Sequence, residues 1–283
     1  MKQLITILLT LTIGFSQSLS KEEKQIRSYI DNHNNEAIDL VEKVVNINSG
    51  TLNMEGNKKV GKIFQAELDK LGFHTYWVTY PDDVKRSGHL FAEMRGGKGK
   101  NILLIGHLDT VFEPDHPFQK YTRKGDTAYG PGVSDMKAGD VSMIYIMKAL
   151  HKIGVLQDMN LTLAFTGDEE KTGGPVSIVR KELVEAGKWA NIGLGFEGAG
   201  GMNTGTIARR SSSSWVLTTT GIQGHSSQIF KDHLGYGAIF EASRILNAFR
   251  EELAPEEYLT FNPGTIVGGT DVNYDPVNSK GTT

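Results

Sequence analysis

The chain has 283 residues, 39% of them hydrophobic, so it can bury a substantial core and is not expected to be disordered. Its length corresponds to roughly two domains of typical size. Thirty basic and 33 acidic side chains give a net charge of -3, which removes the usual electrostatic reason for a nucleic-acid partner. The absence of cysteine excludes disulfides, thiolate zinc ligands and cysteine nucleophiles, so a metal site or catalysis must use other side chains.

The first 20 residues have the order of a secretory signal peptide. Lys2 precedes an uncharged apolar run over 4–15, which is too short to span a bilayer, and small and polar residues follow over 16–20. An amphipathic first helix is the alternative, and the lack of charge in the run argues against it. We therefore expect a signal peptide over 1–20, cleaved near Ser18 or Ser20. The mature protein is then periplasmic or secreted and has no membrane span.

After this segment, helical and strand periodicities alternate along the chain. Helices are expected over residues 21–48, 57–71, 134–153 and 175–186. Strands are expected over residues 73–80, 89–95, 101–106, 160–166 and 192–196. This alternation predicts an α/β domain over 21–203, with a mostly parallel sheet flanked by helices.

A second region begins after residue 203. Residues 206–220 are rich in Ser, Thr and Val and are expected to form one or two strands. A helix is expected over 235–253, and further strand is expected within 259–272. This order predicts a smaller α+β domain over 204–283.

Side chains that could bind a metal or move a proton follow three of the expected strands. In open α/β sheets, ligands bind outside the carboxyl ends of the strands, so we expect these side chains to meet there. His107 and Asp109 follow the strand over 101–106, the three acids Asp168, Glu169 and Glu170 follow the strand over 160–166, and Glu197 follows the strand over 192–196. A fourth position, Asp135, lies in a glycine-rich turn at a helix start.

Each of these features has a plainer explanation when it is taken alone. Asp135 could cap a helix, and the three consecutive acids from Asp168 could form a solvated turn. Taken together they favour a metal site over a purely structural acidic rim, because carboxylates held together repel one another unless a cation or a proton lies among them. Imidazole and carboxylate ligands without thiolate suit Zn²⁺, with Co²⁺ or Mn²⁺ as substitutes.

Four motifs resemble, in order and spacing, the successive signatures of a known family. They are Gly106-His107-Leu108-Asp109-Thr110-Val111, Tyr129-Gly130-Pro131-Gly132 with Asp135-Met136-Lys137, Thr166-Gly167-Asp168-Glu169-Glu170, and Phe196-Glu197. The family is that of the di-zinc peptidases and deacylases typified by glutamate carboxypeptidase, acetylornithine deacetylase and succinyl-diaminopimelate desuccinylase. The resemblance extends from about residue 25 to the end. It implies a zinc exopeptidase-like catalytic domain and an inserted lid domain through which the protein forms a homodimer.

The resemblance also implies a set of metal ligands. His107 and Glu197 would bind one zinc, Asp135 would bridge two zincs, and Glu170 would bind the second zinc. Two nearby zincs would activate a shared water and polarise the scissile carbonyl.

Two further side chains would assist the chemistry without binding metal. Glu169 would be the general base that takes the proton of the water and returns it to the leaving amine. Asp109 would hold the His107 imidazole in the required tautomer.

The lid region contributes two candidate substrate-binding residues. His225 lies in Gly221-Ile222-Gln223-Gly224-His225-Ser226-Ser227, which resembles the lid motif whose histidine polarises the substrate carbonyl. Asn273 matches a lid asparagine that helps to hold substrate. A surface-loop histidine and a turn asparagine before a proline are the alternatives. The other histidines are expected to be surface or structural residues: His33, His74, His89, His116, His151 and His233.

The family continues past the residue at which this sequence ends. Its further part carries a last zinc-binding histidine and a lid arginine that captures the substrate carboxylate. We therefore expect an incomplete sequence and an incomplete lid. As given, the chain is expected to bind at most one metal tightly and to hydrolyse peptides poorly.

The preferred hypothesis is an exported, metal-dependent exopeptidase or amide hydrolase, carboxypeptidase-like, that acts on a small peptide or an N-acyl amino acid. An aminopeptidase or an N-deacylase on the same metal core is the alternative. A non-catalytic, truncated relative that serves as a binding or dimerisation protein is the hypothesis from a different class.

Overall fold

A computed structural model describes residues 19–198, 200–201, 204–275 and 280–282. These residues fall into two compact units, one up to residue 201 and one from residue 204. The expected signal peptide lies outside the described residues except for its last two positions. In the described part, no helix is both long and apolar enough to cross a membrane.

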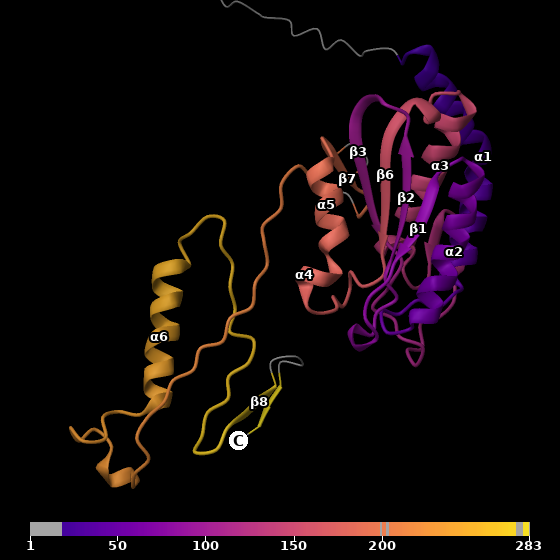
Figure 1. Cartoon of the computed structure of the whole chain (residues 1–283). Coiled ribbons are helices and arrows are strands. Elements are labelled where there is room, and N and C mark those ends of the chain that lie inside the picture. The colour runs from indigo at the N-terminus through magenta and orange to yellow at the C-terminus, as the bar shows by residue number, and fades with distance from the viewer. Residues whose placement is uncertain (1–18, 199, 202–203, 276–279, 283) are drawn as a thin grey trace, which may run out of the picture. The chain divides into compact units, whose positions relative to one another are not determined.

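The first unit is built on a five-stranded sheet with the order β1-β2-β6-β3-β7 (Figure 1). Its strands are β1 (His74–Val78), β2 (His89–Arg95), β3 (Lys98–His107), β6 (Met159–Thr166) and β7 (Ile192–Gly195). β3 runs parallel to β6 and β7, whereas β2 is antiparallel to β1 and β6. The expected α/β class is confirmed, and the sheet is mixed.

Helices cover both faces of this sheet (Figure 1). One face packs against α1 (Lys21–Val45), α2 (Met54–Lys70) and α3 (Ala138–Lys152). The opposite face packs against α5 (Lys181–Trp189), which follows the short helix α4 (Val176–Val179). Neighbouring residues of one strand serve opposite faces, because side chains alternate along a strand. The α1–α3 face buries Leu90, Ala92, Leu104, Leu163 and Phe165, and the α5 face buries Phe91, Leu103 and Ala164.

The helices on the first face begin where the sequence offers caps. Ser20 and Glu23 form a reciprocal capping box at the start of α1, and the Asn53 side chain accepts a hydrogen bond at the start of α2. Gly61 of α2 lies against Trp77 of β1, where an added Cβ would come within 2.6 Å of the indole ring. A glycine at this position therefore lets α2 approach the sheet closely.

The helix expected over 134–153 is divided in the structure. A π-type turn, Val133–Lys137, precedes α3, and both Asp135 and Met136 have non-helical backbone angles within it. Gly132, at a φ of 76°, reverses the chain before the turn. The apolar period continues through the break, which is why periodicity alone predicted one helix.

Smaller elements complete the first unit. A hairpin of β4 (Thr122–Lys124) and β5 (Thr127–Tyr129), which the sequence analysis did not predict, turns at Gly125 with a φ of 59°. The expected helix over 175–186 is interrupted at Arg180, whose φ is -110°. Two short 3₁₀ turns lie at Asp82–Val84 and Leu156–Asp158.

The second unit contains α6 (Ala238–Leu253), a 3₁₀ turn at Ser226–Gln228, and the antiparallel pair β8 (Asn273–Asp275) and β9 (Lys280–Thr282). The expectation of strands within 206–220 and 259–272 was wrong, since neither stretch contains a strand. A strand requires a hydrogen-bonded neighbour, and in the described part of this unit only β8 and β9 pair. A β-forming composition is therefore insufficient here.

Candidate metal centre

Three parallel strands end at one edge of the sheet and direct functional side chains there. His107 is the last residue of β3 and pairs in register with Thr166, the last residue of β6. Ile105 of β3 pairs with Gly195, the last residue of β7, so Glu197 follows at the same edge. The sheet topology thus brings together segments that are far apart in the sequence.

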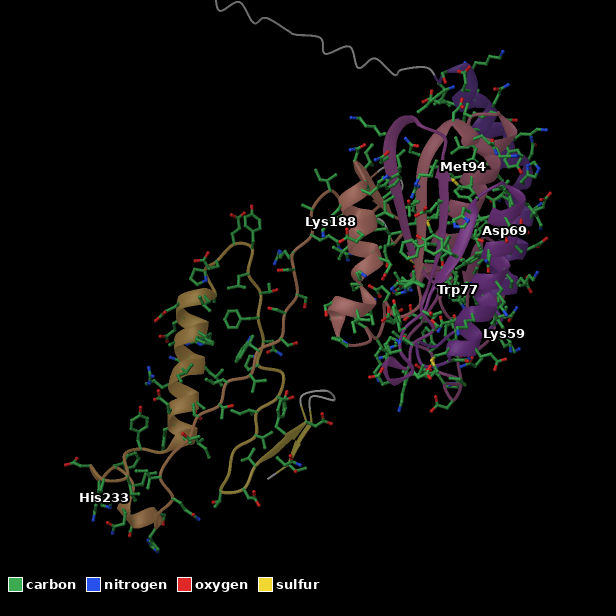
Figure 2. The ribbon with its side chains drawn as sticks, viewed as in Figure 1. Lys59, Asp69, Trp77, Met94, Lys188 and His233 are labelled. Carbon is green, nitrogen blue, oxygen red and sulfur yellow. The ribbon has the colours of Figure 1, made fainter. Side chains whose placement is uncertain are left out.

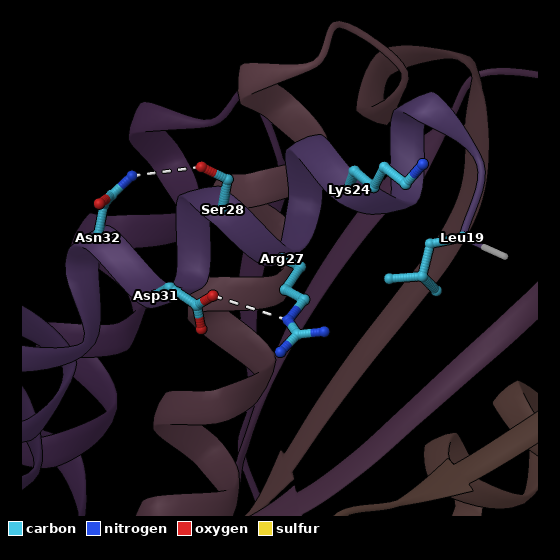
Figure 3. A pocket seen from close by; sticks show the side chains of 6 residues that line it. All are labelled: Leu19, Lys24, Arg27, Ser28, Asp31 and Asn32. Atoms are coloured by element: carbon cyan, nitrogen blue, oxygen red, sulfur yellow. Dashed lines mark hydrogen bonds and ion pairs between the residues drawn. The ribbon is translucent and has the colours of Figure 1, made fainter.

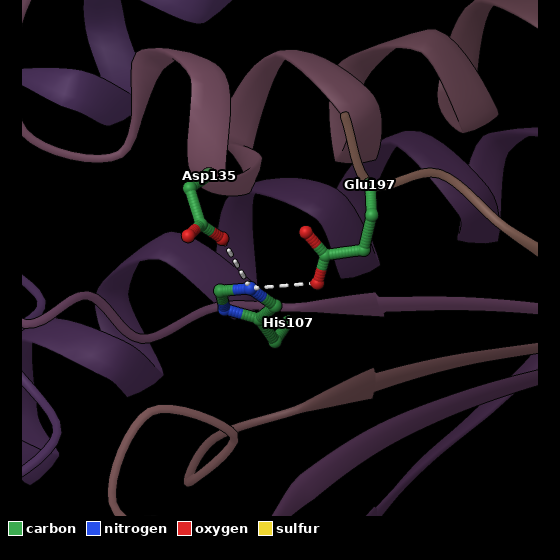
Figure 4. Close-up of side chains that lie close together, drawn as sticks. All are labelled: His107, Asp135 and Glu197. Carbon is green, nitrogen blue, oxygen red and sulfur yellow. Dashed lines mark hydrogen bonds and ion pairs between the residues drawn. The ribbon is translucent and has the colours of Figure 1, made fainter. Parts of the chain in front are cut away.

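Three potential ligands converge at this edge, as Figure 4 shows. The Nε2 atom of His107 lies 3.0 Å from Oδ1 of Asp135 and 3.4 Å from Oε1 of Glu197. One donor atom from each residue lies within 4.8 Å of the others. The imidazole is buried, whereas the carboxylates of Asp135 and Glu197 are 63% and 39% exposed, so the group faces solvent on one side.

A backbone contact sets the tautomer of His107. Its Nδ1 lies 3.0 Å from the carbonyl oxygen of Asp109, which can only accept a hydrogen bond, so Nδ1 carries the hydrogen. Nε2, the nitrogen that faces the two carboxylates, can then offer its lone pair to a cation. The carboxylate of Asp109 is farther from Nδ1, at 3.4 Å. The tautomer therefore depends on the main chain of Asp109 as well as on the side chain that the sequence suggested.

The charges around His107 favour a positive species at the centre. Burial acts to lower the pKa of the imidazole, but the hydrogen bond and charge of Asp109, together with the charges of Asp140 and Glu169, raise it to about 10. Without a metal, a proton on Nε2 would offset the repulsion between the carboxylates of Asp135 and Glu197. A divalent cation would offset this repulsion with twice the positive charge.

The Asp109 side chain organises the neighbouring loop. One carboxylate oxygen accepts the Glu169 amide at 3.0 Å, and the other accepts the Glu170 amide at 3.1 Å and the Thr51 hydroxyl at 2.7 Å. Burial acts to raise the pKa of Asp109, but the hydrogen bonds and the charge of His107 outweigh it and lower that pKa. Asp109 is thus a buried carboxylate that joins His107 to the loop after β6.

The two glutamates of this loop have different environments. Glu169 is exposed, and Glu170 is half-buried. Burial, and then the charge of Asp135, raise the pKa of Glu170 to about 7. Glu170 lies close enough to Asp135 to feel its charge, but it is not in the three-residue group that includes His107. Its expected role as a ligand of a second zinc stays a prediction, as does the role of Glu169 as a base.

Asp168, the first acid of the triplet, has a structural role. It is buried, and its carboxylate accepts from Arg180 Nη1 at 2.5 Å and from the Gly173 amide at 2.8 Å. Arg180 also donates to the Asp168 carbonyl at 3.0 Å and to the Thr172 hydroxyl at 3.1 Å. The loop that carries Glu169 and Glu170 is therefore clamped at both of its ends.

Other buried residues support the same loop and the turn that carries Asp135. His89, expected to be a surface or structural residue, is buried, and its Nδ1 accepts from the Gly167 amide at 3.2 Å. Lys137 is buried and donates through Nζ to the carbonyls of Val44 and Ile47, both at 3.0 Å, at the carboxyl end of α1. Burial lowers the pKa of Lys137 to about 8.

Sequence reasoning missed Thr51, Arg180 and the function of Lys137. Each acts on a partner that lies 12 or more residues away in the chain, and none belongs to a local spacing pattern. The only sequence signal was indirect, since Lys137 stands in the motif that contains Asp135.

The expected substrate-binding residues both lie in the second unit. His225 is exposed, and its Nδ1 lies 2.9 Å from the Ser227 hydroxyl. Asn273 begins β8 opposite Thr282. Their roles stay predictions.

A hollow along the start of α1 offers no comparable chemistry (Figure 3). It is lined by Leu19, Lys24, Arg27, Ser28, Asp31 and Asn32. One carboxylate and no histidine are among these six residues, and that carboxylate pairs with Arg27 at 3.7 Å.

The residues at the sheet edge fit a divalent cation such as Zn²⁺. One imidazole and two carboxylates offer the nitrogen and oxygen donors that zinc accepts, and three protein ligands leave a position open. Burial first, and then the charge of Asp135, raise the pKa of Glu170, so a cation at this edge would also lie near a second acid.

Comparisons with known proteins place this chain beside peptidases and deacylases in sequence. The family model for peptidase family M20/M25/M40 matches residues 103–279. Carboxypeptidase G2 of a Pseudomonas species is 32% identical over 215 residues, which cover 74% of this chain and 49% of that protein. Succinyl-diaminopimelate desuccinylase of Gluconobacter oxydans is 31% identical over 202 residues, covering 67% of this chain and 49% of that protein. The chain thus spans about half the length of these curated relatives.

Two solved structures show a similar fold. Human carnosine dipeptidase 1 has a TM-score of 0.51 at 19% identity. The match covers 70% of this chain and 43% of that structure. The dipeptidase Dug1p of Saccharomyces cerevisiae has a TM-score of 0.50 at 17% identity, with the same two coverages of 70% and 43%. At these identities the likeness concerns the fold.

Proposed function

Because this chain belongs to peptidase family M20/M25/M40, we propose that it is a metal-dependent hydrolase of peptide or amide bonds. The observation that carries the proposal is the convergence of His107, Asp135 and Glu197 at the carboxyl edge of the sheet, beside the loop of Glu169 and Glu170. This arrangement offers a cation site and a free carboxylate next to it, which together suit hydrolysis by an activated water.

His107, Asp135 and Glu197 would hold a Zn²⁺ ion, with Co²⁺ or Mn²⁺ as substitutes. When bound, such an ion lowers the pKa of a water molecule and polarises the carbonyl of the scissile bond. In the proposed mechanism Glu169 accepts the proton of the attacking water on its carboxylate and delivers it to the leaving amine nitrogen. The Asp109 carboxylate orients the base by holding the amides of Glu169 and Glu170.

We propose that the preferred reaction is carboxypeptidase-like, with release of an amino acid from a small peptide or an N-acyl amino acid. The similarity to carboxypeptidase G2 supports this reaction. The similarity to succinyl-diaminopimelate desuccinylase supports N-deacylation as a second candidate. Parallel assays of an N-blocked dipeptide with a free carboxylate and of an N-succinylated amino acid distinguish the two reactions.

Export and dimerisation are part of the same proposal. The order of Lys2, the apolar run over 4–15 and the small residues that follow supports a cleaved signal and a periplasmic or secreted enzyme. N-terminal sequencing of the protein recovered from periplasm or medium tests the cleavage. Sedimentation of the mature chain tests for a homodimer formed through the second unit.

The central test replaces the proposed base. Glu169→Gln removes the proton acceptor but leaves the three ligands in place, so zinc binding should persist while kcat falls by a factor on the order of 10² to 10⁴. Metal content and turnover are measured on the full-length protein, with Glu185→Gln on α5 as a matched control at an exposed glutamate. Undiminished turnover in Glu169→Gln would contradict the assignment. A full-length protein that binds zinc but hydrolyses neither substrate would favour the non-catalytic relative.

The ligand set also predicts the stoichiometry. Three donors gather around one position, whereas a second ion would share Asp135 and add Glu170. We expect about one tightly bound zinc per chain, and His107→Ala should abolish its binding. Two tight equivalents by metal analysis would overturn this expectation.

A further inference from the structure

The turn after α1 lies directly against the segment that follows β3. The Thr51 amide donates to the Thr110 carbonyl at 3.2 Å, and the Thr110 amide donates to the Ser49 carbonyl at 2.9 Å. The Asn57 side chain of α2 holds the Gly50 carbonyl at 3.0 Å. The backbone on both sides of Thr51 is therefore held, and Thr51 itself is buried at 2% exposure. Its hydroxyl has a defined position before any metal or substrate binds.

That hydroxyl donates to the Asp109 carboxylate at 2.7 Å. The oxygen that it reaches is the one that accepts the Glu170 amide, and the second oxygen accepts the Glu169 amide and lies 3.4 Å from His107 Nδ1. Of the donors to this carboxylate, Thr51 alone among the described contacts comes from outside the strand ends that carry His107 and the two glutamates.

We propose that Thr51 is a positioning residue for the metal centre, acting through Asp109. Its hydroxyl holds the Asp109 carboxylate in the rotation at which both oxygens reach the backbone amides of Glu169 and Glu170. The torsion that turns an aspartate carboxylate is broad and only weakly restricted, so its orientation depends on hydrogen bonds. This inference rests on the proposed function, since it concerns the geometry of that metal and that base.

Removal of the hydroxyl leaves a buried carboxylate oxygen with one donor fewer. The carboxylate can then turn toward its remaining donors, and the backbone of the loop shifts with it. The chemistry of a positioned base tolerates little displacement, and groups that support metal ligands typically change affinity or activity by 10- to 100-fold when they are lost. The effect should therefore appear both in metal affinity and in turnover.

The test compares Thr51→Val, which has the same shape without the hydroxyl, with Thr51→Ser, which keeps the hydroxyl. We expect Thr51→Val to weaken Zn²⁺ binding or to lower kcat by about 10- to 100-fold, with KM little changed, and Thr51→Ser to stay within about threefold of wild type. Affinity is measured on the full chain by competition with a chromophoric chelator. Thr75→Val is the matched control, because it removes a similar threonine–aspartate bond, Thr75 Oγ1 to Asp69 at 2.6 Å (Asp69 is labelled in Figure 2). Thr75 lies on the edge strand β1, which β2 and β6 separate from the strand that ends at His107.

The outcomes separate this inference from the proposed function. If the wild-type chain binds no zinc, the proposed function fails. If the wild type binds zinc and Thr51→Val matches it in affinity and turnover, the role of Thr51 is wrong. A Thr51→Ser variant as weak as Thr51→Val would also overturn it, because packing of the methyl group would then be the cause. Circular dichroism of the metal-free variants verifies folding. If Thr51→Val does not fold, Thr51→Ala takes its place in the comparison.

Discussion

At the scale of single residues, the candidate metal centre holds carboxylates near one another although their negative charges repel. Asp135 and Glu197 lie beside one buried imidazole, and the pKa values of His107 and of the nearby Glu170 are raised to about 10 and about 7. Both shifts favour the protonated form, that of His107 because of the nearby carboxylates and that of Glu170 chiefly because of burial. The carboxylates near His107 thus favour a positively charged species beside it.

The first prediction concerns pH. His107 has a folded-state pKa of about 10 against an ordinary 6.5, so in the metal-free chain its contribution to stability is present below pH 6.5 and is lost as pH rises toward 10. Zinc needs the deprotonated Nε2 and must displace this proton, so its affinity should rise by about tenfold between pH 7 and pH 8. Titration calorimetry in two buffers of different ionisation enthalpy counts the released proton. A zinc affinity independent of pH in this window would contradict the prediction.

A second prediction concerns the Arg180–Asp168 ion pair, which holds the loop after β6. Arg180→Met leaves the buried Asp168 carboxylate without its cation, and breaking a buried pair in this way typically costs about 3–5 kcal/mol. The free energy of unfolding, measured by urea denaturation of the metal-free chain, should fall by that amount. Lys188→Met, which breaks an exposed pair with Glu185, should change it by less than about 1 kcal/mol. Equal effects of the two variants would refute a structural role for the Arg180–Asp168 pair.

At the scale of elements, the site depends on how closely α3 approaches the end of β7. Gly139 lies in the first turn of α3, and a Cβ added there would meet the carbonyl oxygen of Phe196 at 2.2 Å. Phe196 directly precedes Glu197, and its amide is held by the Ile105 carbonyl at 3.3 Å. Because Gly139 has no side chain, α3 can approach Phe196 closely, and we expect this approach to set the distance of Glu197 from His107.

The third prediction tests this contact. Gly139→Ala should push the chain at Phe196 outward and weaken zinc binding, and it should also lower the melting temperature, since overpacking of this kind costs about 1–3 kcal/mol. Gly187→Ala in α5 is the control, because a Cβ there meets nothing within 4 Å. That control should keep zinc affinity and raise stability by about 0.4–1 kcal/mol. If Gly139→Ala and Gly187→Ala both bind zinc with wild-type affinity, the close approach at Gly139 does not determine the position of Glu197.

At the scale of the whole molecule, the expected functions divide between the two units. His107, Asp135, Glu169, Glu170 and Glu197 all belong to the first unit, whereas His225 and Asn273 belong to the second. All three members of the candidate metal site thus belong to the first unit.

The fourth prediction follows from this division. A chain of residues 19–201 should fold, as judged by circular dichroism, and should bind zinc within about threefold of the affinity of the full chain, because all three members of the candidate group belong to the first unit. The comparison uses the same chelator competition for both proteins. A much weaker affinity in a folded first unit would show that the second unit supplies a ligand.

Much of the fold and of the metal site could be predicted from local patterns. The apolar runs that became β3 and β6 are buried strands, and His107 and Glu197 follow the strands that the sequence indicated. Other features could not be predicted. The break of the helix at Asp135 lies within an unbroken apolar period, and the stretch over 206–220 has a strand composition without a strand partner. Propensity reports what one segment favours, whereas strands and turns also need partners from elsewhere.

The sequence by itself determined the α/β class, the family signatures and the chemical nature of the ligands, since an exclusively imidazole and carboxylate set follows from a chain without cysteine. Only the tertiary structure decided which acids gather beside His107 and which bind other partners. Asp168 turns away to Arg180, while Asp109 joins Thr51 to the loop of Glu169 and Glu170. The physical reason is that a carboxylate takes its role from the donors and charges around it, and these come from segments that are distant in the sequence.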